Sequence, residues 1–207
     1  MLRFILCKKK LGLNNISMAI VLWKSFYYIT HYQNVASIVQ HGLLSKNHVK
    51  KSRIEVIDIA NKEVQGRRTR IEPIYKRSIH DYVPLYINPK NAMLSAIRHL
   101  TNELVILKIE PAVLENRKHL YTDGNAASSI TLFSESRAVV DLSIPVLLAD
   151  CWSAHEDGKR RRCAEVLIYG SIDAKHIAGA VCSSANVLAH LRKACPGSVE
   201  IDNSFFY

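Results

Sequence analysis

Glu165 is the residue whose type and surroundings most clearly allow chemistry in this sequence. It follows the run of cations at residues 159–162 and opens the apolar run 166–169. Burying a single carboxylate in an apolar stretch of strand length is costly unless another group hydrogen-bonds or pairs with it. Glu165 is therefore either a surface residue at the end of a strand or an acid placed there for function.

The arginines of residues 46–77 are a second group of candidate functional residues. This segment is strongly basic, has little hydrophobic periodicity, and includes the adjacent pair Arg67 and Arg68. Long loops within a compact domain usually serve a function, and the planar guanidinium of arginine binds anionic oxygens through two parallel hydrogen bonds. The alternative is a solvated helix over residues 57–68.

Several well-known catalytic motifs are absent from the sequence. It has no glycine-rich dinucleotide or P-loop motif, no Gly-x-Ser-x-Gly and no His-Glu-x-x-His. The five cysteines are scattered and contain no Cys-x-x-Cys pair, so neither a zinc site nor a disulfide framework is indicated. No apolar run reaches the roughly 18 residues of a membrane span. We expect a cytoplasmic protein without a bound metal.

The charge balance favours a polyanionic partner. Lys and Arg number 28 against 18 Asp and Glu, which gives a net charge of +10. Nucleic acid is the first candidate and an acidic protein the second, while a surplus that only aids solubility is the alternative. The length of 207 residues fits one domain with an ample core.

The elements that must position these residues are mostly short strands. The basic residues 1–25 are expected to form an N-terminal extension, and residues 26–207 a single domain.

His31 lies between a predicted strand and a predicted helix, where capping of that helix is favoured over a functional role. Pro84 indicates a strand edge, a bulge or a strand start. Short strands with few helices indicate an α+β fold. The expected strands cover residues 26–30, 82–89, 104–109, 165–169, 177–182 and 199–201, and the expected helices lie near residues 35–41, 90–100 and 185–193.

Five sequence blocks follow one another along the chain. They are Tyr28-Ile29-Thr30-His31 with Asn34 and Gly42-Leu43-Leu44, Asp81-Tyr82-Val83-Pro84-Leu85-Tyr86 with Pro89 and Met93-Leu94, Thr122-Asp123-Gly124-Asn125-Ala126-Ala127, Trp152, and Lys159-Arg160-x-Arg162-x-Ala164-Glu165-Val166-Leu167. In this order the blocks resemble the DarT family, whose members are ADP-ribosyltransferases that use NAD to modify bases in single-stranded DNA. The resemblance implies an α+β fold with a split, strongly curved sheet and NAD bound in the cleft between its two halves.

The same resemblance implies roles for individual residues. Glu165 is the expected catalytic acid, hydrogen-bonded to the 2′-hydroxyl of the nicotinamide ribose, and the catalytic arginine is either Arg67 or Arg68. Met93 is expected to help form the pocket wall. The residues expected to bind NAD are Tyr28, Thr30, His31, Asn34, Gly42, Leu43, Arg67, Tyr82 and Tyr86. The residues expected to bind nucleic acid are Arg137, Trp152, Lys159, Arg160 and Arg162.

The resemblance also implies a biological setting and leaves alternatives open. The family acceptor is usually thymidine, and the enzyme is expected to be a toxin whose antitoxin removes the modification with a macrodomain. A guanosine, RNA or protein acceptor is the first alternative. The second is a basic nucleic-acid-binding module without catalysis, which would bind oligonucleotides in a salt-dependent way without consuming NAD.

Overall fold

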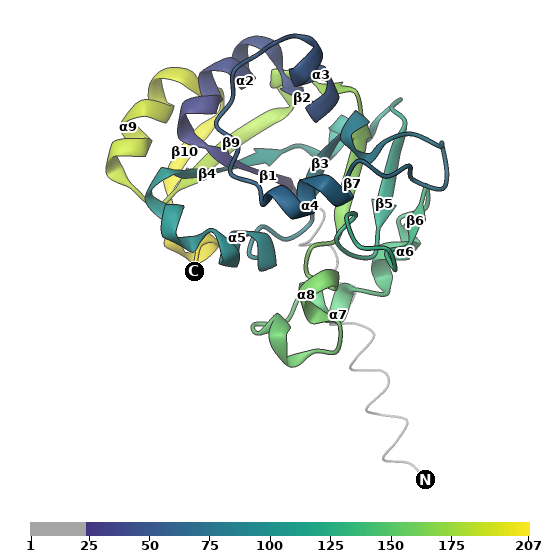
Figure 1. Ribbon diagram of the computed structural model, residues 1–207. Coiled ribbons are helices and arrows are strands. Elements are labelled where there is room, and N and C mark those ends of the chain that lie inside the picture. Colours follow the sequence, from purple (N-terminus) through teal and green to yellow (C-terminus); the bar gives the residue numbers. More distant parts are fainter. Residues whose placement is uncertain (1–23) are drawn as a thin grey trace.

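The computed structural model describes residues 24–207, so all but the last two residues of the expected extension lie outside the described part. Its centre is an eight-stranded sheet with the order β10-β9-β4-β1-β3-β7-β5-β6 (Figure 1). Strands β2 and β8 form a separate two-stranded sheet. The strands are β1 (Phe26–His31), β2 (Leu43–Leu44), β3 (Tyr82–Tyr86), β4 (Leu104–Ile109), β5 (His119–Thr122), β6 (Phe133–Ser134), β7 (Glu165–Tyr169), β8 (Ser171–Ile172), β9 (Ile177–Cys182) and β10 (Ser198–Ile201).

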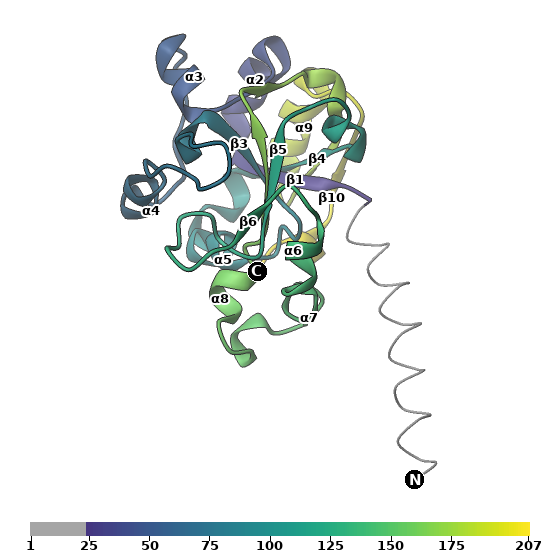
Figure 2. The same cartoon turned by 90° about the vertical axis from the view of Figure 1, so that its right-hand side faces the viewer.

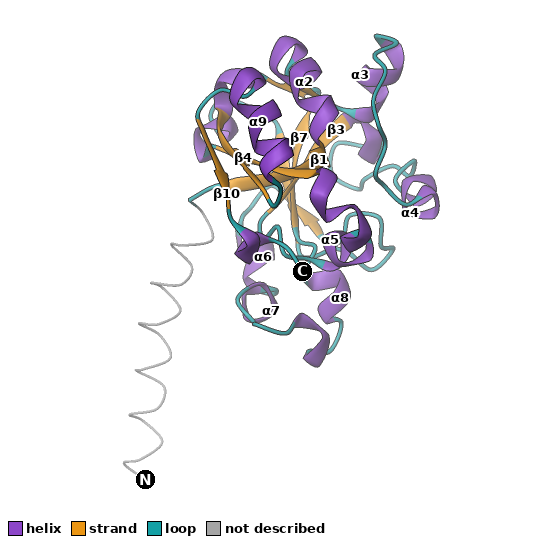
Figure 3. Ribbon diagram, turned by 90° about the vertical axis from the view of Figure 1, so that its left-hand side faces the viewer, coloured by secondary structure: helices purple, strands orange, loops and turns teal. Residues whose placement is uncertain are grey.

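Short helices surround this sheet (Figures 1 and 3), which confirms the predicted α+β class. None of the helices formed by residues 24–207 has the length and apolar content of a membrane span. The α-helices are α2 (Val35–His41), α3 (Lys46–Lys51), α4 (Lys62–Arg67), α5 (Ala92–Ala96), α6 (Ala138–Asp141), α7 (Ile144–Leu147), α8 (Gly158–Arg161) and α9 (Ala185–Ala194). The 3-10 helices are η1 (Tyr32–Asn34), η2 (Ile79–Asp81), η3 (Arg98–Glu103), η4 (Pro111–Leu114), η5 (Trp152–Ala154), η6 (Ala174–His176) and η7 (Asn203–Phe205).

The sheet divides between β1 and β3. Strand β1 pairs with β4 from Phe26 to His31, whereas its pairing with β3 is at Tyr27 and Tyr86. Pro84 therefore lies where β3 borders this division, which is locally a strand edge and accommodates a residue without an N–H donor. The division separates the strands into two halves, as the family resemblance implies.

Alternation along the strands gives the sheet two buried faces. In β4, Val105 and Leu107 belong to one apolar cluster with residues of α9, whereas Leu104 and Ile106 belong to a second cluster with Leu94 of α5. This arrangement follows from the two-residue period of a strand. A third, smaller cluster includes Leu167 of β7 and is covered by the loop between α4 and β3. The fold thus fixes the start of β7, where Glu165 lies, between packed layers.

Two predicted helices differ from those observed. The helix considered for residues 57–68 is limited to α4, and residues 54–60 form a loop. The helix expected over residues 90–100 consists of α5 followed by η3. Residues 54–60 are mostly apolar, but Val56 and Ile57 remain 48% and 44% exposed, so burial gives a helix there little stabilisation. Their loop instead forms part of the cavity described next.

Candidate functional site

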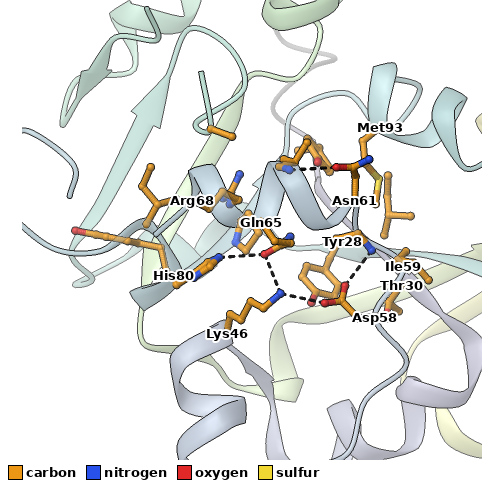
Figure 4. Close-up of a pocket in the computed structure, with 18 of the residues that line it drawn as sticks. Tyr28, Thr30, Lys46, Asp58, Ile59, Asn61, Gln65, Arg68, His80 and Met93 are labelled. Carbon is orange, nitrogen blue, oxygen red and sulfur yellow. Dashed lines mark hydrogen bonds and ion pairs between the residues drawn. The ribbon is translucent and has the colours of Figure 1, made fainter. Parts of the chain in front are cut away.

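A cavity of about 1190 Å³ lies at the division of the sheet. Its wall contains residues from β1, α4, β3 and α5, together with the loop 54–60 (Figure 4). Ligand pockets usually measure about 300–1,000 Å³, so this cavity is large enough for a molecule of the size of a dinucleotide. The lining mixes aromatic rings with several cations, including Lys46, Lys50 and Arg68.

Glu165 and Arg68 form a buried ion pair at this cavity. The Arg68 guanidinium donates two parallel hydrogen bonds, from Nη1 to Oε1 at 3.0 Å and from Nη2 to Oε2 at 2.9 Å. Glu165 is fully buried and Arg68 is 6% exposed. Burial alone would lower the pKa of Arg68, but the adjacent Glu165 carboxylate outweighs burial and raises it. The Arg68 guanidinium therefore keeps its positive charge at a position shielded from water.

The elements around Glu165 hold its carboxylate in one orientation. Glu165 is the first residue of β7 and pairs with Tyr86 of β3. Its backbone N–H donates to Thr122 Oγ1 at 3.0 Å, and the N–H of Ala126 donates to its Oε1 at 2.8 Å. Arg68 is the C-cap residue of α4, so the position of that helix sets the position of the guanidinium.

The structure separates the two arginines between which the sequence could not choose. Arg68 contacts Glu165, whereas Arg67 is exposed at the cavity wall. Arg68 also lines the cavity, while Glu165 lies behind it. The guanidinium thus stands between the carboxylate and the space available to a ligand.

Most of the residues expected to bind NAD share this cavity, and His31 does not. Tyr28, Thr30, Asn34, Gly42, Leu43, Arg67, Tyr82, Tyr86 and Met93 all line it. His31 follows Thr30 in the strand, so its side chain lies on the opposite face. Its Nδ1 accepts from the N–H of Gln33 at 3.3 Å, and its Nε2 bonds Glu103 at 2.9 Å. In this structure His31 caps η1, and its contact with NAD stays a prediction.

Asn34 holds the loop 54–60 against the cavity. Its side-chain amide donates to the carbonyl of Ile57 at 2.9 Å, and its Oδ1 accepts from the N–H of Ile57 at 2.9 Å. The same amide group donates to Thr30 Oγ1 at 3.0 Å. Lys46 adds a second attachment, because its ammonium bonds Asp58 Oδ2 at 3.0 Å. Asn34 thus acts on the cavity through this loop.

Four functional candidates escaped the sequence analysis: Lys46, Asp58, Gln65 and His80. They form a chain of contacts along the cavity wall (Figure 4), in which Gln65 Oε1 lies 3.0 Å from both Lys46 Nζ and His80 Nε2. The spacing of these residues follows no recognisable motif, and no signal in the sequence places their side chains together. Burial and the cations Lys46, Arg68 and Lys50 lower the pKa of His80 to about 4.

His80 should make stability depend on pH. Because its folded pKa is below the ordinary value of about 6.5, the unfolded chain binds an extra proton as pH falls from about 6.5 towards 4, and stability is lost in that window. With allowance for solvent screening, we expect a loss of about 1 kcal/mol between pH 7 and pH 5. Denaturant unfolding of the wild type and His80→Gln at both pH values measures it. An equal loss in the two proteins would contradict the assignment.

The residues expected to bind nucleic acid have diverse positions. Lys159 is exposed and lines the cavity, and Arg137 is exposed at the start of α6. The indole N–H of Trp152 donates to the Tyr207 hydroxyl at 2.8 Å. Arg160 also reaches the cavity, but its guanidinium is engaged by Asp123 at 2.8 and 3.0 Å. Of this set, Lys159 has the most accessible charge beside the cavity.

Arg162 is placed differently from the prediction. It is 5% exposed, and its Nε donates to the carbonyl of Lys90 at 2.8 Å. Its Nη1 donates to the carbonyls of Val146, Leu147 and Ala149 at 2.7–3.0 Å. These carbonyls lie at the end of α7, where helix carbonyls lack partners within the helix. Arg162 is therefore a structural anchor for α7.

Residues 24–207 contain no group of three His, Cys, Asp or Glu side chains arranged to hold a metal ion. Arg53, Arg70 and Asp157 also line the cavity, in addition to the charged residues already described.

Comparison with known proteins places this site in a family. The family model described as "ssDNA thymidine ADP-ribosyltransferase, DarT" matches residues 27–207. A DNA ADP-ribosyl transferase–DNA ADP-ribosyl glycohydrolase fusion protein of Thermosipho africanus is 28% identical over 177 residues, which cover 83% of this chain and 46% of that protein. This chain thus spans just under half of the fusion protein. A DNA ADP-ribosyl transferase of Escherichia coli O127:H6 is 26% identical over 190 residues, covering 84% of each chain.

Solved structures show the same fold. Thermosipho africanus DarTG in complex with ADP-ribose superimposes with a TM-score of 0.79 at 28% identity, covering 89% of this chain and 51% of that one. Thermus sp. 2.9 DarT in complex with ADP-ribosylated ssDNA gives a TM-score of 0.77 at 22% identity, covering 89% and 97%. Since the family model matches nearly the whole of the described chain, the protein belongs to the DarT family of ssDNA thymidine ADP-ribosyltransferases.

Proposed function

We propose that this protein transfers ADP-ribose from NAD to a thymidine base in single-stranded DNA and releases nicotinamide. The observation that carries the proposal is the buried pair of Arg68 and Glu165 at the wall of a cavity large enough for a dinucleotide. Membership of the DarT family supports both the co-substrate and the acceptor. A solved relative, Thermus sp. 2.9 DarT, binds NAD+ in the same fold.

Glu165 is the proposed catalytic acid. The reaction breaks the bond between C1′ of the ribose and nicotinamide, and it forms a bond between C1′ and a ring nitrogen of thymidine, with loss of the proton from that nitrogen. As nicotinamide leaves, the ribose becomes cation-like, and a fixed carboxylate beside it stabilises that charge. The Glu165 carboxylate is held in place by Arg68 and by the N–H of Ala126. These contacts fix the orientation of the carboxylate before charge develops.

Arg68 is the proposed catalytic arginine. It lines the cavity in front of Glu165, so NAD meets the guanidinium before it meets the carboxylate. For Glu165 to hydrogen-bond the ribose 2′-hydroxyl, Arg68 must release one of its two hydrogen bonds to the carboxylate. A guanidinium released in this way faces the phosphates or the acceptor base while remaining close to the acid.

The rest of the cavity suits the other parts of NAD. Lys50 and Arg53 line its wall and supply positive charge for the diphosphate. Burial raises the pKa of Tyr86 well above its ordinary value, and the Glu165 carboxylate adds to this rise. Burial likewise raises the pKa of Tyr28. Both rings are therefore neutral and offer uncharged aromatic surface to the nicotinamide end.

A toxin role with a macrodomain antitoxin is part of the same proposal. The Thermosipho africanus relative joins a DNA ADP-ribosyl transferase to a DNA ADP-ribosyl glycohydrolase in one chain, which supports a functional pairing of the two activities. We expect a separate or fused glycohydrolase to reverse the modification made by this protein.

Mass spectrometry of modified oligonucleotides tests the proposed reaction. Four single-stranded oligonucleotides, each offering one reactive base in an inert sequence, are incubated with NAD and the protein. We expect an adduct of ADP-ribose mass on the thymidine oligonucleotide. Nicotinamide release without any DNA adduct would assign the acceptor to RNA or protein. Absence of NAD consumption would leave only a nucleic-acid-binding module.

The clamp between Asn34 and Ile57 should control NAD affinity. Asn34→Ala removes two hydrogen bonds that hold the loop 54–60, each worth about 1 kcal/mol. We expect the KM for NAD to rise about tenfold with little change in kcat, because the loop lies at the cavity wall and not at the reacting atoms. Steady-state nicotinamide release measures both constants. The exposed Asn102→Ala is the matched control, and an unchanged KM in Asn34→Ala would contradict the role of the loop.

A further inference from the structure

Cations and aromatic rings are interleaved at the end of β7 that lies farthest from Glu165. We call Tyr75, Arg77, Lys118 and Tyr169 the basic aromatic patch. The Arg77 guanidinium carbon lies 3.9 Å from the centroid of the Tyr169 ring and 5.6 Å from that of Tyr75. Lys118 Nζ lies 5.4 Å from the centroid of the Tyr75 ring. Tyr169 is 45% exposed, so a large aromatic ring faces solvent here.

The patch retains hydrogen-bonding capacity. Arg77 Nη1 is buried and has no hydrogen-bond partner within the described chain. A buried donor without a partner is costly, and a ligand that brings an acceptor removes that cost. Lys118 is exposed, as is the neighbouring Lys76. Stacked rings beside such cations are the arrangement that binds single-stranded nucleic acid, because rings stack on bases and cations contact phosphates.

Strand β7 joins the patch to the catalytic centre. Its side chains alternate, so Glu165, Leu167 and Tyr169 lie on one face of the strand. Four residues at about 3.3 Å each separate Glu165 from Tyr169 by roughly 13 Å. That span corresponds to about four stacked nucleotides at 3.4 Å per nucleotide. A single strand with its reactive base near Glu165 can therefore reach the patch.

Two loops near this part of the sheet expose aliphatic side chains. The loop from α4 to β3 lies over this part of the sheet (Figures 1 and 2) and contacts the segment after β5, where Arg70 Nη2 donates to the carbonyl of Ala126 at 2.9 Å. Ile71 and Ile74 of the loop are 58% and 41% exposed, and Ile130 in the segment after β5 is 66% exposed. Exposed aliphatic groups of this kind offer contact area to unstacked bases.

Cations outnumber the acidic groups near the patch. Glu72 is fully buried, and its carboxylate accepts from the N–H groups of Ile74, Tyr75 and Arg77 at 2.7–3.1 Å, so it is not accessible to a ligand. Glu135 is exposed and accepts a hydrogen bond from the Tyr75 hydroxyl. Against this one accessible carboxylate stand Arg77, Lys118 and Lys76, so the patch has a net positive charge.

We propose that the basic aromatic patch binds nucleotides that flank the reactive base of the single-stranded DNA substrate. The inference rests on the proposed function, since it takes single-stranded DNA as the acceptor. Tyr169 stacks on a flanking base, while Arg77 and Lys118 contact the phosphates next to it. The patch thus extends the acceptor site along β7 and makes affinity depend on oligonucleotide length.

Binding measurements with oligonucleotides of two lengths test the patch. Fluorescence anisotropy without NAD compares a strand of about four nucleotides with one of about twelve, each with a single thymidine. We expect Tyr169→Ala to weaken binding of the long strand about tenfold, which corresponds to the loss of one stacked base, and to leave the short strand unaffected. Tyr169→Phe, which keeps the ring, should bind as the wild type does.

The salt dependence of binding tests the contribution of the Lys118 charge. Lys118→Gln should make the dependence of log affinity on log salt concentration less steep for the long strand. The expected decrease in the magnitude of the slope is roughly 0.7, which corresponds to the loss of one phosphate contact on a single strand. Lys193→Gln is the matched control, because Lys193 is exposed on α9, which packs at the opposite end of the sheet near β10. It should leave the salt slope unchanged.

The outcomes separate this inference from the proposed function. Equal affinity of all variants for the long strand would overturn the patch, as would an equal loss for both strand lengths, since that loss would reflect a distorted site. If the wild type modifies thymidine while the patch variants bind normally, the proposed function stands and the patch fails. If the wild type modifies neither strand, the proposed function fails first.

Discussion

Replacing Glu165 by glutamine should lower kcat for ADP-ribose transfer by about a thousandfold or more. Glutamine keeps the size of the side chain but removes the negative charge that stabilises the cation-like ribose, and removal of one preorganised electrostatic group commonly costs a factor of 10²–10³ or more. The KM for NAD should change much less, because the charge acts mainly on the transition state. Quenched single-turnover measurement of nicotinamide release and of the DNA adduct separates chemistry from binding.

The control for Glu165→Gln is Glu103→Gln. Glu103 is largely exposed, with a side-chain exposure of 54%, and it bonds His31 outside the cavity. We expect its kcat to stay within about twofold of the wild-type value, which also checks that His31 takes no part in catalysis. Thermal unfolding must show that Glu165→Gln is folded. A folded Glu165→Gln protein that retains more than a tenth of the wild-type rate would overturn the assignment of the catalytic acid.

Arg68→Ala should inactivate the enzyme, whereas Arg67→Ala should leave most activity. Removing Arg68 takes away the guanidinium that orients Glu165 and faces the cavity, so we expect kcat/KM to fall by about 10²–10³. It also leaves a buried carboxylate without its counter-ion, which costs about 3–5 kcal/mol of stability. Arg67 is exposed at the cavity wall, and its removal should lower kcat/KM by about threefold or less.

Arg68→Lys separates the two effects of Arg68. Lysine keeps a positive charge beside Glu165 but cannot form the two parallel hydrogen bonds of the guanidinium. We expect much of the lost stability to return while kcat/KM stays well below the wild-type value. Denaturant unfolding and steady-state kinetics of the three variants provide the comparison. Equal activity losses in Arg67→Ala and Arg68→Ala would contradict the separation of their roles.

The sequence singled out Glu165 as a candidate because a buried carboxylate in an apolar strand is costly. A lone acid in a buried strand needs a partner, and the structure supplies that partner in Arg68. The choice between Arg67 and Arg68 was not visible. Neighbouring residues in a helix point about 100° apart, and α4 is too short and too polar to show which of its faces is buried.

The different positions of the cations at residues 159–162 were hidden in the sequence for a similar reason. Residues 159–162 read as one basic run, yet Lys159 is exposed while Arg162 is buried. The interior position of Arg162 depends on the carbonyls at the end of α7, which need donors, and no local pattern in the sequence shows that this helix end packs there. His31 was more predictable, since its place between strand and helix already favoured capping.

The loop 54–60 shows a further limit of sequence reasoning. Its sequence contains few turn signals, and its position depends on Asn34, which is 23 residues away from Ile57 along the chain. Local propensity cannot encode such a contact, whereas the family resemblance already placed Asn34 near the NAD site. The α+β class, by contrast, followed from strand patterns that are local.

The mutual burial of Arg68 and Glu165 also affects how a cell can escape this protein if it is a toxin. A mutation at either position should abolish the proposed chemistry and leave an unpaired charge in the interior, so we expect the altered chain to be less stable. Losses of even 1–2 kcal/mol lower the abundance of a protein severalfold through proteolysis. Escape mutants at the catalytic pair should therefore be scarce proteins, while those in the loop 54–60 should accumulate normally. Sequencing of surviving cells, combined with measurement of the protein level, would thus distinguish two classes of inactivating mutation: those at the catalytic pair with little protein, and those in the loop 54–60 with normal amounts.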